Sequence, residues 1–387
     1  MVAFTEVRDK LLTLDQVRER VATTEPLDTK YLSQSDKIRF AFEPSWALAL
    51  DSRKGTDPVD AVIRVNGRDH QLTKDAAIQA GSSFGLTGVY AQRVPSNLLE
   101  NHLNYWYSSA GLGDREFNML STGADSHVAA FTRPTIHPYS NRLLLENVLN
   151  GIQEHYGSQE VFADYKMNHS LVRTDIRLIL PEVTRSITNG GMPDVPTGFE
   201  DVWSAGIHLT NSLIGKSQTK LEGYLFRWWC ANGAITQLPD VGAWSRRGAT
   251  EEEDVYQWAL TSIENVLGGL EYQFDQVQAL TQLNVSGNVQ NIVGEIFDNY
   301  DVPKTQRQPI LDTLIESENL SMYTIMNAVT QTANIEGLSS DRVDKLMRIG
   351  GDIPSSTFDT LKAKVWREGH SAEPEQRNPY EVTTLVI

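Results

Sequence analysis

Residues 171–180 read LVRTDIRLIL, a run in which two kinds of side chain alternate. Its even-numbered positions are apolar or threonine, whereas Arg173, Asp175 and Arg177 occupy odd-numbered positions. Successive side chains of a strand point to opposite faces of a sheet. The run therefore predicts a β-strand with one dry side and one charged side, and it places strands at the centre of the chain.

The flanking sequence extends this pattern in both directions. Short β-like runs between 36 and 72 include an Asn66-Gly67 dipeptide, which is typical of a tight hairpin turn. Residues 139–156 carry a helical pattern, and two strand-like runs flank Gly215-Lys216. From Glu251 onward the pattern is helical. The sequence therefore predicts an α+β fold with a strand-rich central domain and flanking helices, followed by an acidic, all-helical C-terminal domain.

These patterns divide the chain into four segments. We expect a mixed α/β segment at 1–116, a strand-rich core at 117–249, an acidic helical domain at 250–368 and a flexible tail at 369–387. The tail ends in YEVTTLVI, an apolar and β-prone peptide. Such a peptide either packs on its own domain or adds as a strand to a neighbouring subunit or partner.

Composition limits the cellular setting. The chain has 387 residues and a single cysteine, Cys230, so no intrachain disulfide can form. The charged N-terminal stretch lacks the features of a secretory signal, and no uninterrupted apolar run approaches the length of a membrane span. We therefore expect a protein of the host-cell cytoplasm that makes no membrane contact.

The formal net charge of -16 is unevenly distributed. Residues 251–387 hold 22 acidic and 9 basic side chains, whereas residues 130–250 hold 11 of each. The acidic last third would repel phosphate, but the balanced centre can still gather its cations on one face. Net charge alone therefore does not exclude nucleic-acid binding.

Two stretches resemble a known family. The first contains an Arg-x-x-Cys-x-Asn-Gly core at Arg227, Cys230, Asn232 and Gly233, and the second contains Asn-Ala-Val-Thr at 327–330. Both are similar, in order and separation, to the phage and plasmid-like proteins that carry the domain of unknown function 932. The resemblance covers about residues 200–335 and implies an α+β fold and an origin in a mobile genetic element. Genes of this setting resemble those of single-strand annealing proteins of the RecT/Redβ type.

The central region holds the ingredients of a single-strand binding groove, which are cations for phosphates and aromatic faces for stacking. We therefore expect a phage-encoded protein that binds single-stranded DNA, assembles into homo-oligomers and performs no bond chemistry. The candidate nucleic-acid-binding residues are Arg133, Arg142, Lys166, Arg173, Arg177, Lys216, Lys220, Arg227, Trp228, Arg246 and Arg247.

Two alternatives remain open. An acidic interaction module would inhibit or redirect a host protein by presenting the charge of the C-terminal third to a basic partner. A metal-dependent nuclease would use the Asp164-x-Lys166 triplet with Asp125 upstream. The sequence contains no phosphate-binding Gly-rich loop and no metal-ligand spacing of histidines. We therefore expect no catalytic residues, no metal and no cofactor.

Overall fold

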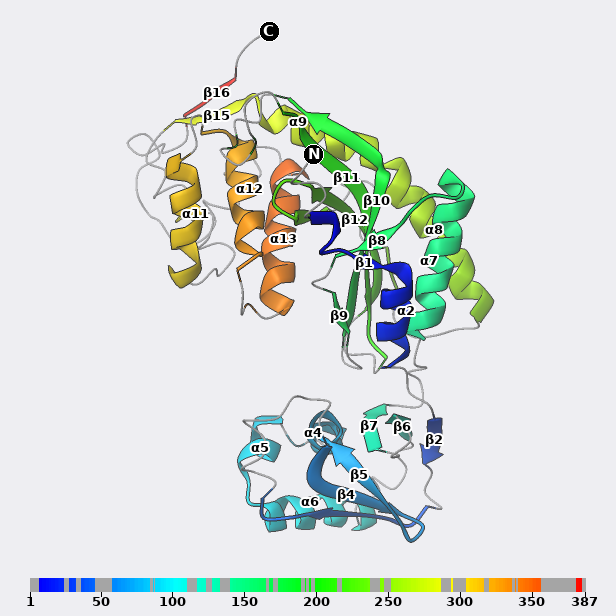
Figure 1. Ribbon diagram of the computed structural model, residues 1–387. Coiled ribbons are helices and arrows are strands. Elements are labelled where there is room, and N and C mark those ends of the chain that lie inside the picture. Colours follow the sequence, from blue (N-terminus) through cyan, green and yellow to red (C-terminus); the bar gives the residue numbers. More distant parts are fainter. Residues whose placement is uncertain are drawn as a thin grey trace.

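A computed structural model confirms the α+β class of the chain (Figure 1). The structure describes residues 7–23, 28–32, 36–45, 58–83, 86, 88–109, 117–122, 127–132, 140–164, 167–169, 173–188, 192, 195, 199–213, 218–236, 244–246, 252–286, 294, 304–316, 320–335, 338, 340–355 and 381–384. They form a large unit around one sheet and a small unit around another.

The large sheet has the strand order β1-β8-β10-β11-β12-β13, with β9 beside β10 and β14 beside β12. Its central strands pair antiparallel over long stretches. The strands are β1 (Leu12–Thr13), β8 (Phe162–Ala163), β9 (Asn168–His169), β10 (Thr174–Ile187), β11 (Asp201–Asn211), β12 (Thr219–Arg227), β13 (Asn232–Thr236) and β14 (Trp244–Arg246).

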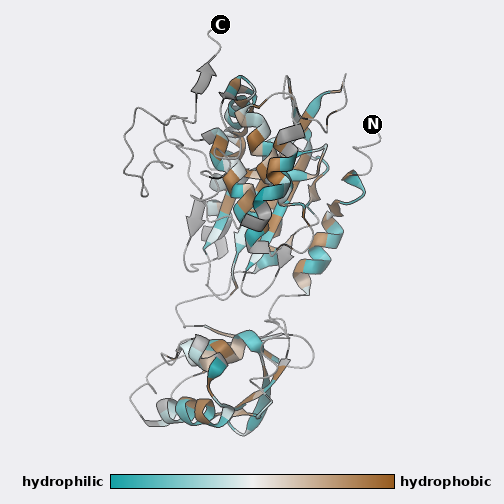
Figure 2. Ribbon diagram, turned by 90° about the vertical axis from the view of Figure 1, so that its left-hand side faces the viewer, coloured by the Kyte–Doolittle hydropathy of each residue, from teal (hydrophilic) through white to brown (hydrophobic). Residues whose placement is uncertain are grey.

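Helices cover both faces of the large sheet. The hydrophobic residues between helices and strands form one continuous core, and Figure 2 shows apolar residues gathered there. Helices α7 and α8 approach closely, because a Cβ on Gly151 would lie 2.4 Å from the Cδ1 atom of Ile263. The helices of this unit are α2 (Leu14–Ala22), α7 (Asn141–Tyr156), α8 (Glu252–Gly268), α9 (Leu270–Leu280), α11 (Lys304–Glu316), α12 (Met322–Thr332) and α13 (Ser340–Ser355).

The small unit has its own sheet and its own core. The strand order is β2-β6-β7-β5-β4-β3, and helices α4, α5 and α6 accompany it. The elements are β2 (Asp28–Leu32), β3 (Ile38–Phe42), β4 (Pro58–Val65), β5 (Arg68–Thr73), α4 (Lys74–Ser83), α5 (Gly88–Arg93), α6 (Ser96–Ser109), β6 (Phe117–Thr122) and β7 (His127–Thr132). The chain enters this unit after α2 and leaves it before α7, so the small unit is an insertion in the large one.

The predicted Asn66-Gly67 hairpin is present between β4 and β5. Asn66 has φ 53° and Gly67 has φ 86°, so both residues occupy the left-handed region that this turn requires. The helix predicted at 139–156 is α7. The predicted strand at 171–180 corresponds to the first half of β10 from Thr174 onward, while residues 171–172 lie outside the described residues. Both faces of β10 are buried from Thr174 through Leu180. Its charged side is covered because α13 packs over it.

The segment boundaries drawn from the sequence do not coincide with the two cores. Strands β6 and β7 follow residue 116 but pair with the small sheet rather than with the central strands. Apolar residues of α8, α9, α12 and α13 share one core with the large sheet. Local periodicity locates the elements, whereas the burial of apolar faces decides which elements fold together.

Near the C-terminus, β16 (Glu381–Thr384) pairs antiparallel with β15 (Leu283–Ser286) of the same chain. The apolar tail therefore returns to its own chain, one of the two arrangements that the sequence left open. Among the described residues, no helix combines the length and the apolar character needed to cross a lipid bilayer.

Candidate functional site

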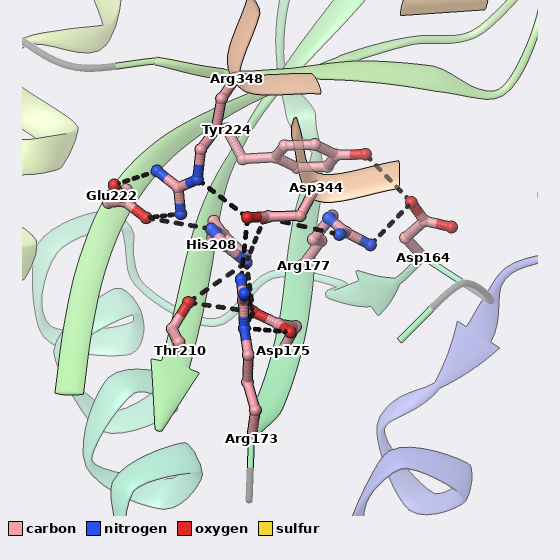
Figure 3. Close-up of polar contacts among 10 residues, drawn as sticks. All are labelled: Asp164, Arg173, Asp175, Arg177, His208, Thr210, Glu222, Tyr224, Asp344 and Arg348. Atoms are coloured by element: carbon pink, nitrogen blue, oxygen red, sulfur yellow. Dashed lines mark hydrogen bonds and ion pairs between the residues drawn. The ribbon is translucent and has the colours of Figure 1, made fainter. Parts of the chain in front are cut away.

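A group of charged and polar side chains lies between the large sheet and α13 (Figure 3). We call it the His208 network. Its members come from the β8 end, from β10, β11 and β12, and from α13. They are Asp164, Arg173, Asp175, Arg177, His208, Thr210, Glu222, Tyr224, Asp344 and Arg348.

Strand register brings the centre of this network together. Arg177 is the cross-strand partner of His208, and His208 is the partner of Glu222, so one row crosses β10, β11 and β12. Asp175 pairs with Thr210 in the next row on the same face. Directly opposed side chains in neighbouring strands lie within contact distance. All five residues are at most 3% exposed.

Helix α13 supplies two further members of the His208 network. Asp344 and Arg348 are four residues apart and therefore share one helix face, where the Nε atom of Arg348 donates to Asp344 at 2.9 Å. The two Nη atoms of Arg348 donate to the two carboxylate oxygens of Glu222 at 2.5 and 2.6 Å. This bidentate pair holds α13 against β12.

Arg173 and Arg177 connect the carboxylates of β10 and α13. The Nη2 atom of Arg173 donates to Asp175 at 2.9 Å and to Asp344 at 2.8 Å. Arg177 lies 3.9 Å from Asp344 and 3.9 Å from Asp164. The Arg173 side chain is 26% exposed, so the network reaches solvent at that point.

Gly206 permits a further contact across the sheet. It lies between Ile179 and Tyr224 in the cross-strand register, and a Cβ there would approach the Tyr224 ring to 3.1 Å. The ring therefore passes over the glycine, and the Tyr224 hydroxyl donates to Asp164 at 3.2 Å.

Burial and pairing act in opposite directions on these ionisable groups. Burial raises the pKa of Glu222, but hydrogen bonds from His208 and Arg348 outweigh it and lower the pKa to about 2. Burial lowers the pKa of His208, yet its hydrogen bonds with Asp175 and Glu222 leave that pKa raised. Burial also raises the pKa of Asp344, but His208, Arg348 and Arg173 hold it well below the ordinary range. Glu222 and Asp344 are therefore ionised at neutral pH.

The network has the composition of a reactive site but not its accessibility. Asp175, His208 and Asp344 each offer one ligand atom of the kind that holds metals, and these atoms all lie within 4.8 Å of one another. His208 is 0% exposed and Asp344 is 5% exposed. Among the described residues the network reaches solvent at Arg173, while His208 and Asp344 are enclosed. This arrangement is suited to a structural role or to the binding of an ion.

A second buried group occupies the opposite face of the sheet, because Arg227 is five residues from Glu222 on the regular strand β12. We call it the Arg227 network. The Nε atom of Arg227 donates to Asp201 at 2.8 Å, and the Tyr323 hydroxyl of α12 donates to the same carboxylate at 2.5 Å. The Trp203 indole N–H donates to the Tyr323 oxygen at 2.9 Å.

The Arg227 network joins two stretches that are distant in sequence, residues 227–233 and 327–330. Arg227 donates to the Sγ atom of Cys230 at 3.0 Å, and Cys230 contacts Asn232 at 2.7 Å. Asn232 donates to the Thr330 hydroxyl at 2.5 Å, although 98 residues separate them in sequence. A Cβ on Gly233 would lie 2.3 Å from the Tyr224 oxygen, so no larger residue fits there. These residues have structural roles that account for the motif.

Three of the candidate nucleic-acid-binding residues are in the interior. Arg177 is 1% exposed, Arg227 is 0% exposed and Trp228 is 5% exposed. The Trp228 indole donates to Ser204 at 2.7 Å within the core. The sequence prediction of surface roles is corrected for these residues, because carboxylates on neighbouring elements pair with both arginines inside the protein.

Four other candidates are placed at one end of the large sheet. Arg173 directly precedes β10, Lys220 lies near the start of β12, and Arg246 of β14 pairs with Thr219. Arg142 is exposed near the start of α7, where the neighbouring Asn141 accepts a hydrogen bond from Asn211 at the end of β11. We call this place the Arg173 end of the sheet. The remaining candidates lie outside the described residues, namely Arg133, Lys166, Lys216 and Arg247.

The nuclease alternative receives no support from Asp164. Its side chain is 0% exposed and faces Arg177 and Tyr224, while Asp125 and Lys166 lie outside the described residues. No pattern in the sequence singles out His208, Glu222, Asp344 or Arg348. Their separations in the chain match no local motif, and the one local signal is the four-residue spacing of Asp344 and Arg348 on a helix.

No protein-family model, curated protein or solved structure matches this chain. The site is therefore interpreted from its own geometry.

Proposed function

We propose that this protein binds single-stranded nucleic acid and holds it for pairing without breaking bonds, in the manner of a phage single-strand annealing protein. The observation that carries the proposal is the gathering of candidate cations at the Arg173 end. The backbone positions of four of them, far apart in sequence, lie there on or beside separate elements: Arg142, Arg173, Lys220 and Arg246.

Strand pairing explains why these cations come together. Thr174 at the start of β10 pairs with Asn211 at the end of β11, and Lys220 pairs with Thr210. The Thr219 hydroxyl donates to Asn211 at 2.8 Å. Cations on adjacent strand ends and a helix start can contact successive phosphates, as single-strand binding requires.

The junction with the small unit is at the same end. Leu213 lies two residues beyond the end of β11 and is buried against Leu120, Ala129 and Ala130 of the small sheet. A bound strand at the Arg173 end would therefore run beside both units. Arg142, Lys220 and Arg246 belong to neither buried network, whereas Arg173 is already paired with Asp175 and Asp344. Binding through the first three residues leaves both networks intact, which agrees with a role in holding rather than in catalysis.

The test is fluorescence anisotropy with labelled oligodeoxythymidine at several salt concentrations, with size-exclusion chromatography of the same samples. We expect salt-sensitive binding and particle growth, which would indicate homo-oligomers. The triple variant Arg142→Gln, Lys220→Gln, Arg246→Gln should weaken binding, and the salt slope should fall by about 0.7 for each lost phosphate contact.

The matched control removes three exposed cations elsewhere, Lys10→Gln, Arg93→Gln and Lys345→Gln. It has the same net charge as the test variant and should bind almost as the original chain does. Equal weakening in both variants would refute a specific site at the Arg173 end. No binding at low salt would refute the proposal and favour an acidic module with a host protein partner.

A further inference from the structure

His208 is surrounded by hydrogen-bond acceptors on both ring nitrogens. Its Nδ1 atom lies 3.2 Å from a Glu222 oxygen, and its Nε2 atom lies 3.3 Å from Asp175 Oδ1 and 3.8 Å from Asp344 Oδ1. The Thr210 hydroxyl donates to Asp175 at 3.1 Å, so it turns its oxygen lone pairs toward Nε2. A neutral imidazole carries one N–H, so one ring nitrogen faces acceptors with its lone pair. The cluster therefore requires a further cation, either a second proton or a metal ion.

Glu222 decides which ring nitrogen carries the hydrogen. Arg348 fixes both Glu222 oxygens, and one of them accepts from Nδ1. This carboxylate–histidine pair is the usual outer-shell support of a histidine that ligates a metal through its other nitrogen. The Nε2 lone pair is then directed toward Asp175 and Asp344, as Figure 3 shows.

Asp344 supplies the independent observation. Its Oδ1 atom is buried and accepts no hydrogen bond from any described residue, although its Oδ2 atom accepts from Arg173 and Arg348. The distance of 3.8 Å to Nε2 is too long for a hydrogen bond. It is close to the ligand separation of about 3.4 Å expected around a tetrahedral ion with bonds of about 2.1 Å.

We propose that Asp175, His208 and Asp344 bind a divalent transition metal ion of the zinc class. Two carboxylates and a neutral imidazole form a ligand set whose charge a divalent ion cancels. Arg348 pairs with Glu222, and Arg177 lies 3.9 Å from both Asp164 and Asp344. Arg173 pairs with Asp175 and Asp344, and because its side chain is 26% exposed it is the cation that a bound ion would displace toward solvent. The ion joins β10, β11 and α13, and its burial makes it a structural ion.

The test uses the full chain, purified without a metal-affinity tag or chelator. Elemental analysis should find about one zinc ion per chain after exposure to Zn²⁺ and desalting. After removal of the metal, titration with Co²⁺ should produce the visible absorption of a low-symmetry, four-coordinate ion. Thermal unfolding should shift upward with either ion.

The variants Asp344→Asn and His208→Gln should weaken Co²⁺ binding by at least about 100-fold, since each removes a ligand. Asp201→Asn is the matched control, because it changes a buried carboxylate on the other face of the same sheet. It should leave Co²⁺ binding unchanged.

Less than about one tenth of an equivalent of zinc, or no Co²⁺ absorption, would overturn the proposal and assign the second proton to His208. Retention of full binding by Asp344→Asn would overturn it as well. If the variants do not fold, the stoichiometry and the cobalt spectrum of the unaltered chain still decide.

Discussion

The two buried networks of the large unit lie on opposite faces of one sheet. They differ in whether the charges of their own residues balance one another. In the Arg227 network, one guanidinium meets one carboxylate, and Tyr323 completes the hydrogen bonding of Asp201. In the His208 network, the carboxylates of Asp164, Asp175, Glu222 and Asp344 face three guanidiniums and one imidazole. The first is balanced by its own residues, whereas the second is balanced only when His208 or its surroundings gain a positive charge.

Buried charges therefore have two different roles in this protein. A balanced ion pair fixes side chains and strands against each other, and removal of one partner leaves an uncompensated charge inside the protein. The stability of a cluster with excess negative charge also depends on whether the solution supplies a proton or a metal ion. The Arg227 network should therefore respond mainly to mutation, and the His208 network to mutation and solution conditions alike.

The largest effect is expected from Arg227→Met, which leaves Asp201 ionised and buried. The free energy of unfolding should fall by about 3–5 kcal/mol in urea denaturation followed by circular dichroism. Arg185→Met is the control, because Arg185 pairs with Glu271 and Asp275 at the surface, and it should lose less than about 1 kcal/mol. Similar losses of unfolding free energy in the two variants would contradict the distinction between buried and surface ion pairs.

The next effect is expected from Arg348→Met in the His208 network. Glu222 would keep its contact with His208, and the Arg348 side chain is 24% exposed, so the loss should be about 2 kcal/mol. Arg342→Met changes an exposed arginine of the same helix and should be nearly neutral. A loss of unfolding free energy as large as that of Arg227→Met would mean that the two networks depend equally on their own ion pairs.

A smaller effect is expected from Thr330→Val, which removes the acceptor of the Asn232 amide. Unfolding free energy should fall by about 1–2 kcal/mol, since a buried donor loses its partner. Thr332→Val is the matched control on α12, because the Thr332 hydroxyl donates to the backbone oxygen of Ala328 within its own helix. If Thr332→Val were the more damaging change, Asn232 would not depend on Thr330.

The smallest effect concerns His70 of the small unit, which is far from either network. Burial, followed by the charges of Lys30 and Arg68, lowers the pKa of His70 below 6.5. Because the unfolded chain then binds a proton more readily, stability is present above pH 6.5 and declines as the pH falls through that value. Hydrogen exchange of the β4 and β5 amides at pH 7.5 and 5.5 should show this decline, and His70→Asn should reduce it.

Local patterns in the sequence were sufficient for the class of the fold and for several elements. Alternation located β10, and the Asn66-Gly67 dipeptide located a hairpin with both residues at positive φ. These features depend on neighbours in the chain. The assignment of β6 and β7 to the small sheet depends on distant partners such as Leu72 and Val128, which no local pattern contains.

The candidate site could be predicted only in part for the same reason. Arg173 and Arg177 were selected as cations, but their acidic partner Asp344 is about 170 residues away. The sequence presented these arginines as charges available to phosphate. Only the packing of α13 shows that Arg177 is buried and paired, and that His208 lies at the centre of the cluster.

The insertion of the small unit also bears on how such a chain can be assembled and edited. Its first strand, β2, and its last strand, β7, both pair antiparallel with β6, so they run in the same direction and the start of β2 and the end of β7 lie at opposite ends of these strands. A unit with its own core can be exchanged as a cassette, but a linker in its place must span the length of these strands. A replacement must also cover Leu213, which the small unit buries, whereas the members of both charge networks all belong to the large unit.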